Sequence, residues 1–165
     1  METVSLNFDS IGIQQCQQNK YPLLFVDRIT KVIPGERASG LKCFTYNEWF
    51  FPAHFEDDPN VPGFIQVEAL VQVFIMTFLC MDKYKGKKTN FISIDKVKFK
   101  KKIVPGDTLI VEATLNYLKR GIAKGCAEGF VDGEFCCSAE FMVTIPDIFN
   151  GFNPSNKVAT TINEV

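Results

Sequence analysis

Residues 64–81, FIQVEALVQVFIMTFLCM, form a long apolar stretch that decides how the rest of the chain must be arranged. The stretch approaches the length of a membrane span, but Gln66, Glu68 and Gln72 all lie in its first half. A carboxylate at that place would be costly in lipid, so we interpret the stretch as a helix of a soluble protein. Its other positions are apolar all round, which is typical of a helix that is buried on every side.

Most of the remaining chain alternates apolar and polar residues with the period of two that half-buried strands show. The segments with this pattern are residues 23–33, 37–45, 91–100, 108–118 and 135–145. Asp132-Gly133 and residues 119–121 predict tight turns, and connections this short join antiparallel neighbours. The apolar residues change parity after Ile94, so we expect a bulge near Asp95-Lys96.

A single apolar helix needs a surface that wraps round it, and a curved antiparallel sheet supplies such a surface. We therefore predict an α+β fold in which one sheet surrounds one long helix. Residues 1–20 are expected to form an N-terminal segment with a short helix, and residues 21–146 the wrapped domain. Residues 147–165 lack periodicity and predict a tail of loop or partial disorder, in which Phe149 and Phe152 are candidates for docking.

The composition is that of one globular domain. The chain has 165 residues, 46% hydrophobic and 22% charged, which suits a core that needs no disulfide or metal. A formal net charge of −1 makes general attraction to nucleic acid unexpected. The six cysteines include no C-x-x-C pair, and one histidine cannot complete a zinc cluster, so no metal site is expected. We interpret the cysteines as free thiols in a reducing cytoplasm, and residues 1–10 lack the basic start of a signal peptide.

His54 is the only histidine and lies in a proline-rich loop, residues 51–63, that leads straight into the predicted helix. An imidazole exchanges protons near neutral pH. Glu68, inside the apolar helix, is expected to stay partly protonated because burial disfavours its charge. Such a base and acid suit proton removal at one carbon and proton donation at its neighbour. Taken singly, each has a simpler explanation: a loop histidine is usually solvated, and Glu68 could face water or favour the helix dipole.

Two further features have both a functional and a plain structural interpretation. At Pro62-Gly63 the first helical N–H groups have no internal partner and can bind an oxyanion, although the same step could be a simple turn into the helix. A lysine run predicts either a dock for an acidic partner or phosphate, or an ordinary solvated strand face. Its members are Lys96, Lys98, Lys100, Lys101 and Lys102, of which alternation places the first three on one face.

Five short motifs occur in the same order as in a known enzyme family. They are YPLLFVDR at 21–28, H-F-x-x-x-P-x-x-P-G at 54–63, EALVQ at 68–72, Phe99 with VPGD at 104–107, and VDGE at 131–134. Together they cover about residues 21–145 and resemble the FabZ-type 3-hydroxyacyl-acyl-carrier-protein dehydratases. The resemblance implies the hotdog fold, which agrees with a sheet wrapped round a helix. It also implies a lyase that converts a 3-hydroxyacyl thioester into a trans-2-enoyl thioester.

The resemblance assigns roles to individual residues. It implies that His54 and Glu68 are the catalytic pair and that opposite subunits of a homodimer supply them. Three such dimers could assemble further into a trimer of dimers. It implies that the Gly63 amide binds the thioester carbonyl, without a metal or redox cofactor. Further residues that would contact the substrate, which is carried on the phosphopantetheine arm of acyl carrier protein, are Phe55, Pro62, Phe64 and Gln72. The lysine run would then meet the acidic carrier protein.

The chain departs from the family pattern in the catalytic loop. Where the family has Pro-Gly after His-Phe, this chain has Glu56-Asp57, followed by Asp58. This difference and the longer tail predict a specialised member of the family, whose substrate the sequence leaves open. Two alternatives stay open: a hotdog acyl-thioesterase, and a non-catalytic acyl-binding hotdog protein, which would have no need of a paired acid and base.

Overall fold

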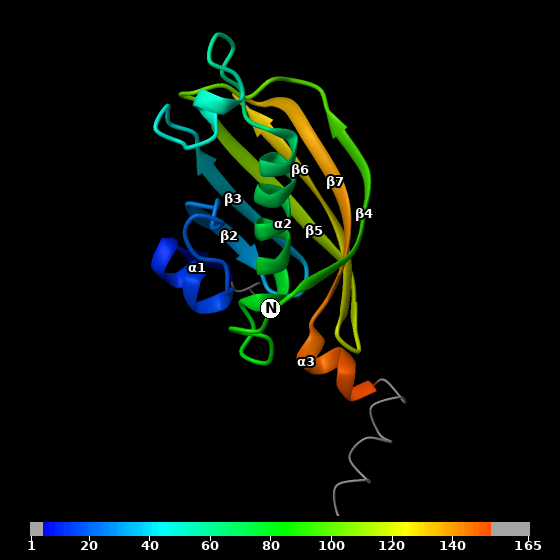
Figure 1. Cartoon of the computed structure of the whole chain (residues 1–165). Coiled ribbons are helices and arrows are strands. Elements are labelled where there is room, and N and C mark those ends of the chain that lie inside the picture. The colour runs from blue at the N-terminus through cyan, green and yellow to red at the C-terminus, as the bar shows by residue number, and fades with distance from the viewer. Residues whose placement is uncertain (1–4, 153–165) are drawn as a thin grey trace, which may run out of the picture.

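The computed structural model describes residues 5–152, which form one antiparallel sheet and a long central helix (Figure 1). The strand order in the sheet is β1-β2-β3-β5-β6-β7-β4. The strands are β1 (Leu6–Phe8), β2 (Arg28–Ile33), β3 (Arg37–Cys43), β4 (Asn90–Phe99), β5 (Thr108–Lys119), β6 (Ile122–Val131) and β7 (Glu134–Thr144). The helices are α1 (Ser10–Cys16), α2 (Gly63–Leu79) and α3 (Pro146–Phe149), with short 3-10 turns at Phe51–Ala53 and Asn150–Phe152.

Helix α2 lies across the concave face of the sheet, so the predicted α+β arrangement is confirmed (Figure 1). The helix packs mainly on β3, β5, β6 and β7. Fully buried large side chains on it include Leu70, Phe74, Phe78 and Leu79, which fill the space between helix and sheet. In the described part of the chain, no helix is long and apolar enough to cross a membrane.

One stripe of α2 departs from the prediction of burial on every side. Phe64 is 65% exposed, and Val67 and Glu68 are only partly buried. These positions recur at intervals of three and four, so they lie on the same side of the helix. A single sheet encloses the helix on its other sides and leaves this stripe open.

Glycines let the helix approach the sheet closely. A Cβ atom at Gly125 of β6 would lie 2.1 Å from the Thr114 carbonyl oxygen and 2.4 Å from the Phe74 ring. A Cβ at Gly40 of β3 would lie 2.9 Å from the Val73 side chain. Since real Cβ contacts are longer than this, only glycine allows the observed distance between α2 and these strands.

The predicted turns and bulge are confirmed. Asp132 and Gly133 both have positive φ, at 51° and 77°, as the tight turn between β6 and β7 requires. Arg120 and Gly121, between β5 and β6, have φ of 53° and 78°. The pairing of β4 with β7 changes register between Asp95 and Lys98, where the parity change predicted a bulge.

The first predicted strand is too long. Only Arg28–Ile33 of residues 23–33 is strand, and Phe25 and Val26 instead donate their backbone N–H groups to the Gln72 side chain of α2, at 2.8 and 3.3 Å. A side chain of the helix thus takes the place of a neighbouring strand. The N-terminal segment contains the predicted short helix α1, but also strand β1, which pairs with β2.

The start of the predicted tail continues as α3 and a 3-10 turn. The Phe149 backbone packs against Gly121, where a Cβ atom would lie 2.5 Å from the Phe149 nitrogen, whereas Phe152 is 59% exposed and does not dock. Residues 153–165 of the predicted tail lie outside the described residues. All six cysteines are free thiols, as predicted, and Cys16, Cys136 and Cys137 are buried.

Gly125→Ala is expected to lower the free energy of unfolding by about 3 kcal/mol, because the added methyl group meets rigid backbone as well as the Phe74 ring. Urea unfolding measures this change. At Gly151 a Cβ atom would meet nothing within 4 Å, so Gly151→Ala is a control that should stay within about 0.5 kcal/mol of the parent. Equal stability of the two variants would contradict the close packing of β6 on α2.

Candidate active site

In the loop after the 3-10 turn Phe51–Ala53, Asn60 makes two of the contacts that hold His54. His54 Nδ1 lies 3.0 Å from the Asn60 carbonyl oxygen, and the Asn60 backbone N–H donates to the His54 carbonyl at 2.9 Å. A carbonyl can only accept, so the neutral imidazole carries its proton on Nδ1. The lone pair of Nε2 is therefore available to accept a proton from a substrate.

His54 faces a hollow of about 310 Å³ at the start of helix α2. The lining residues are His54, Asn60, Val61, Gly63, Gln66, Phe99 and Lys100 to Lys102. Gly63 is the first residue of the helix, after Pro62 at the N-cap, so its N–H has no partner within the helix. A Cβ at Gly63 would lie 2.9 Å from the tip of the Phe99 ring, so a larger residue there would have to displace this half-exposed side chain. A base and an unpaired helix N–H thus border one hollow.

Phe55, Pro62 and Phe64, which were predicted to contact the substrate, are sequence neighbours of lining residues but do not themselves line the hollow. The Phe55 ring stacks on the His54 imidazole, with 4.3 Å between ring centroids, and is 51% exposed. Pro62 is buried, and Phe64 is exposed on the open stripe of α2. Gln66 is 5% exposed and donates from Nε2 to the Val61 carbonyl at 2.9 Å. These contacts fix the loop onto the first turn of the helix.

Glu68 lies on the open stripe of α2 and does not line the His54 hollow. Gln72 Nε2 and Asn19 Nδ2 both donate to its Oε1 atom, at 2.8 and 3.2 Å. Burial is the largest influence and raises the pKa of the carboxyl above its usual value of 4.5, against the two hydrogen bonds, which lower it. Glu68 is therefore a carboxyl that folding biases toward its protonated form.

Helical geometry separates Glu68 from the hollow of its own chain. Each residue turns the helix by about 100°, so Glu68 points about 160° away from Gln66, which lines the hollow. Phe64 and Val67 share the side of Glu68. Within one chain, the structure brings His54 and Gly63 together but directs the predicted acid elsewhere.

Gln72 was predicted to bind the substrate, but its amide is occupied inside the protein. It is fully buried, its Oε1 accepts from Phe25 and Val26, and its Nε2 donates to the Leu23 carbonyl and to Glu68. These bonds use all the hydrogen-bonding capacity of the Gln72 amide. In this structure Gln72 therefore orients Glu68 and the segment before β2.

The lysine run divides into two groups. The bulge and the end of β4 at Phe99 break the expected alternation, so Lys100 leaves the face that it was predicted to share with Lys96 and Lys98. Lys96 and Lys98 line a shallow hollow on the outer face of the sheet with Glu140, to which Lys96 is paired at 2.9 Å. The second group, Lys100, Lys101 and Lys102, borders the His54 hollow.

Two of these lysines are also paired. Lys101 is bonded to Glu134 at 2.5 Å, and Lys102 to Asp58 of the acidic loop that follows His54. Glu56, Asp57 and Asp58 are exposed. Asp58, which follows the two positions that depart from the family pattern, therefore places one carboxylate against the basic rim of the hollow.

A buried ion pair that the sequence analysis missed anchors the chain ahead of His54. Lys42 is 7% exposed and binds Glu48 at 2.5 Å, with Asp27 at 3.6 Å. Asp27 also accepts from the Cys43 backbone N–H at 2.7 Å. This network ties the loop between β3 and the 3-10 turn to the sheet. Asn19 was missed too, because nothing in its local pattern distinguishes it from other polar residues.

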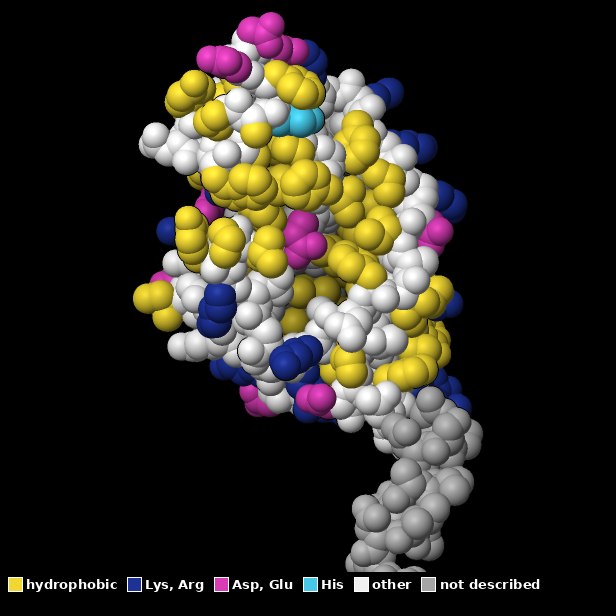
Figure 2. All heavy atoms as spheres, viewed as in Figure 1, with side chains coloured by type: hydrophobic (Ala, Val, Ile, Leu, Met, Phe, Trp, Pro, Cys, Tyr) yellow, Lys and Arg dark blue, Asp and Glu magenta, His cyan; other side chains and the backbone are white. Residues whose placement is uncertain are grey.

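The open stripe of α2 belongs to a larger apolar face. Figure 2 shows hydrophobic side chains gathered on the side of the molecule where α2 is uncovered. The edge strand β4 adds to the exposed apolar surface with Phe91, Ile92, Ile94, Val97 and Phe99. Exposed apolar side chains in this number, at an unpaired sheet edge, are typical of a protein–protein interface.

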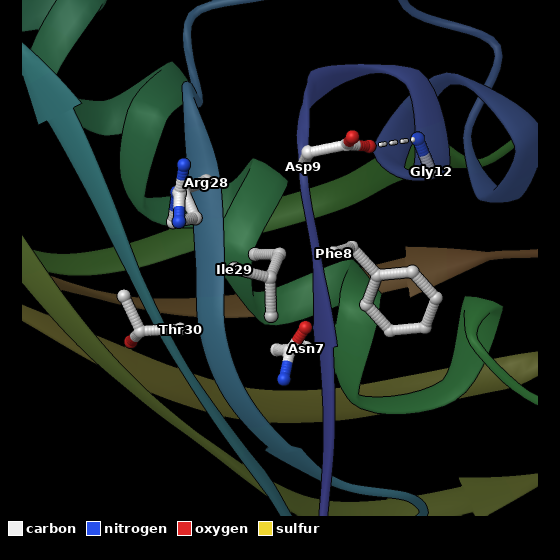
Figure 3. A pocket seen from close by; sticks show the side chains of 7 residues that line it. All are labelled: Asn7, Phe8, Asp9, Gly12, Arg28, Ile29 and Thr30. Carbon is white, nitrogen blue, oxygen red and sulfur yellow. Dashed lines mark hydrogen bonds between the residues drawn. The ribbon is translucent and has the colours of Figure 1, made fainter.

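A larger hollow, of about 520 Å³, is lined by a different set of residues, which Figure 3 labels. It is bordered by β1, β2 and the start of α1, and Asp9 at its rim accepts a hydrogen bond from the Gly12 N–H at 2.8 Å. That bond caps helix α1. Its lining includes neither His54 nor Glu68.

Comparison with known proteins identifies the family. A family model described as a FabA-like domain matches residues 18–140. The chain is 42% identical over 138 residues to 3-hydroxyacyl-[acyl-carrier-protein] dehydratase FabZ of Caldicellulosiruptor saccharolyticus, covering 84% of this chain and 99% of that protein. It is 46% identical over 127 residues to the FabZ of Caldicellulosiruptor bescii, covering 77% and 91%. The chain belongs to the FabZ-type dehydratase family.

The hotdog fold that the family resemblance implied is also confirmed. The solved structure titled the dehydratase heterocomplex ApeI:P from Xenorhabdus doucetiae matches with a TM-score of 0.70. The match covers 92% of this chain and 97% of that chain at 11% identity, so it supports the fold alone. The five FabZ-like motifs thus lie on a hotdog frame in which Glu68 is outside the lining of the His54 hollow.

Replacing Glu68 should change how stability depends on pH. A carboxyl whose pKa is raised by folding contributes stability that is complete below its unfolded value of 4.5 and is lost as pH rises through the folded value. Glu68→Gln removes this loss, so its free energy of unfolding should exceed that of the parent increasingly as pH rises from about 4 to about 8. Urea unfolding across this range tests the sign.

The exposed Glu128, on the outer face of β6, supplies the matched control. Glu128→Gln should follow the parent at every pH. A Glu68→Gln variant that gains nothing relative to the parent between acid and alkaline pH would contradict the raised pKa of Glu68.

Proposed function

We propose that this protein is a dehydratase that removes water from a 3-hydroxyacyl thioester carried by acyl carrier protein, in fatty-acid or related acyl biosynthesis. Membership of the FabZ-type family supports the reaction class. The observation that carries the proposal is the complementary state of two side chains. His54 keeps a free Nε2 beside the unpaired Gly63 N–H, and Glu68 is a carboxyl held toward its protonated form.

In the proposed reaction His54 Nε2 removes a proton from C2 of the acyl chain. The electron pair of the C–H bond passes to the thioester carbonyl, and the enolate oxygen accepts a hydrogen bond from the Gly63 N–H. The enolate then collapses to form the C2=C3 double bond while the C3–O bond breaks. The departing hydroxyl takes the proton of Glu68 and leaves as water. Proton exchange with solvent returns His54 to the neutral form and Glu68 to the acid, so no metal or redox cofactor takes part.

The proposed active site needs two protomers. Glu68 points away from the His54 hollow of its own chain, and it stands in the uncovered apolar face that α2 and β4 present. Pairing two such faces would bury the exposed side chains and bring Glu68 of one protomer to the hollow of the other. We therefore infer a homodimer with shared sites, and a trimer of dimers is a further assembly that the same protomer would allow.

The basic rim of the hollow suits the proposed carrier. Lys100, Lys101 and Lys102 border the hollow that contains His54, where an acidic carrier protein would have to deliver its phosphopantetheine arm. Lys96 and Lys98 lie on the outer face of the sheet, farther along β4. We assign docking to the first group on this ground. The six free thiols support a reducing, cytoplasmic location.

The proposal predicts a new enoyl absorbance when the protein meets a 3-hydroxyacyl carrier-protein thioester. His54→Ala and Glu68→Gln should each lower kcat by about a hundredfold or more, since each removes one positioned proton-transfer group. Glu128→Gln should retain the parent activity. Thiol release without enoyl product would favour a thioesterase, and ligand binding without turnover by the parent would favour an acyl-binding protein.

Shared sites predict complementation between inactive variants. Mixing and refolding His54→Ala with Glu68→Gln makes about half of the dimers mixed, and each mixed dimer has one site with both groups intact. About a quarter of parent activity should return. Absence of recovery, with subunit exchange verified by mass spectrometry, would place both groups of a site in one chain. Light scattering that finds an active monomer would also contradict shared sites.

A further inference from the structure

The hydrogen bonds on the Glu68 carboxyl are unequally distributed between its two oxygens. Both amide donors, from Gln72 and Asn19, point at Oε1. Oε2 accepts no hydrogen bond from the described residues. A carboxylic acid has one carbonyl-like oxygen, which accepts, and one hydroxyl oxygen, which carries the proton. When Glu68 is protonated, its proton can be on either oxygen. Because two N–H donors occupy Oε1, the proton is favoured on Oε2.

Asn19 is held in place by its sequence neighbours. The buried Gln17 donates from its side chain to the Gln72 carbonyl at 3.4 Å, and Gln18 donates to the Gly86 carbonyl at 2.7 Å. Lys20 donates from Nζ to the Gln14 carbonyl at 3.2 Å. The segment between α1 and β2 is thus fastened to α2 and to the loop beyond it just before Asn19, and to α1 just after it. Such anchoring allows a short side chain to keep one direction.

We propose that Asn19 is a positioning residue that acts through Glu68: with Gln72 it occupies Oε1, so that the proton given to the departing hydroxyl is held on Oε2. Asn19 touches neither His54 nor its hollow. Its effect is on the orientation and the acidity of the acid group. This inference rests on the proposed function for its kinetic consequence, but the Asn19–Glu68 contact itself is independent of any substrate.

Few other groups compete for control of Glu68. The segment packed against it contains three titratable residues: Lys20, which bonds to Gln14, Tyr21, which is 91% exposed, and Asp27, which pairs with Lys42. On α1 the only titratable neighbour is the buried Cys16, whose thiol pKa is raised by burial. No lysine or arginine affects the pKa of Glu68, which burial raises and which the amides of Gln72 and Asn19 lower. Loss of the Asn19 amide should therefore raise it further.

The kinetic test compares variants that remove, keep or invert the donor. Asn19→Ala should lower kcat about tenfold with little change in KM, and it should move the alkaline limb of the pH profile, where Glu68 loses its proton, up by about one pH unit. Asn19→Gln keeps an amide N–H and should shift the limb less. Asn19→Asp has the volume of asparagine but no donor, so it preserves the test if the alanine variant fails to fold. The alkaline limb of Asn19→Asp should move up at least as far as that of Asn19→Ala.

Gln18→Ala is the matched control, because it removes an amide of the same segment that bonds to Gly86 and not to Glu68. It should leave kcat and the alkaline limb where the parent has them. An equal change in Gln18→Ala and Asn19→Ala would mean that Asn19 only fastens the segment, and would overturn the proposal. An unmoved limb in folded Asn19→Ala and Asn19→Asp would overturn it as well.

A titration without substrate separates this inference from the proposed function. The carboxyl carbon of Glu68 can be followed by NMR in protein labelled with ¹³C-glutamate, with its signal assigned by loss in Glu68→Gln. Asn19→Ala should raise the titration midpoint, and Gln18→Ala should not. A raised midpoint in a protein that makes no enoyl product would contradict the proposed function but support the contact. A dehydratase with an unmoved midpoint would refute the role of Asn19.

Discussion

Burial of helix α2 in the curved sheet is the constraint on which the other features depend. The helix is apolar on nearly every side, and glycines at Gly40 and Gly125 let the strands close around it. The sheet cannot surround it completely, so one stripe stays open and contains Glu68. The same burial that stabilises the fold raises the pKa of this carboxyl, and therefore prepares an acid at the surface where a partner would meet it.

Local sequence patterns predicted the parts of the fold that have a period or a turn signal. The two-residue period marked the long strands, Asp132-Gly133 marked the last hairpin, and a change of parity marked the bulge in β4. Strand β1 has three residues, which are too few to show a period. The start of β2 was predicted wrongly because Phe25 and Val26 are satisfied by Gln72, which lies far away in the sequence. No local pattern can contain such a contact.

The candidate site was predictable to a similar extent. His54, Gly63 and Glu68 stand at conspicuous places in the sequence, but only the motifs suggested that they act together. The bonds that Gln72 makes to Glu68 and to Leu23 were not predicted, since a glutamine in an apolar helix gives no sign of which groups it will bond. Asn19 and the Lys42–Glu48 pair join segments distant in sequence, so they became visible only in three dimensions. The grouping of the lysines depended on where β4 ends, and strand boundaries are the least certain part of a pattern.

The bulge in β4 also affects how readily the exposed edge of the sheet can take up a foreign strand. A newly made protomer exposes an unpaired strand edge with Phe91, Ile92 and Ile94 beside it, a combination that invites uncontrolled aggregation. Within this edge the backbone is kinked at Lys96, which has a φ of 48°, and Lys96 and Lys98 bring exposed charge to it. A flat foreign strand cannot add along a kinked and charged edge without losing hydrogen bonds or burying lysine. The irregularity in β4 thus protects the exposed edge of the sheet against the addition of a foreign strand.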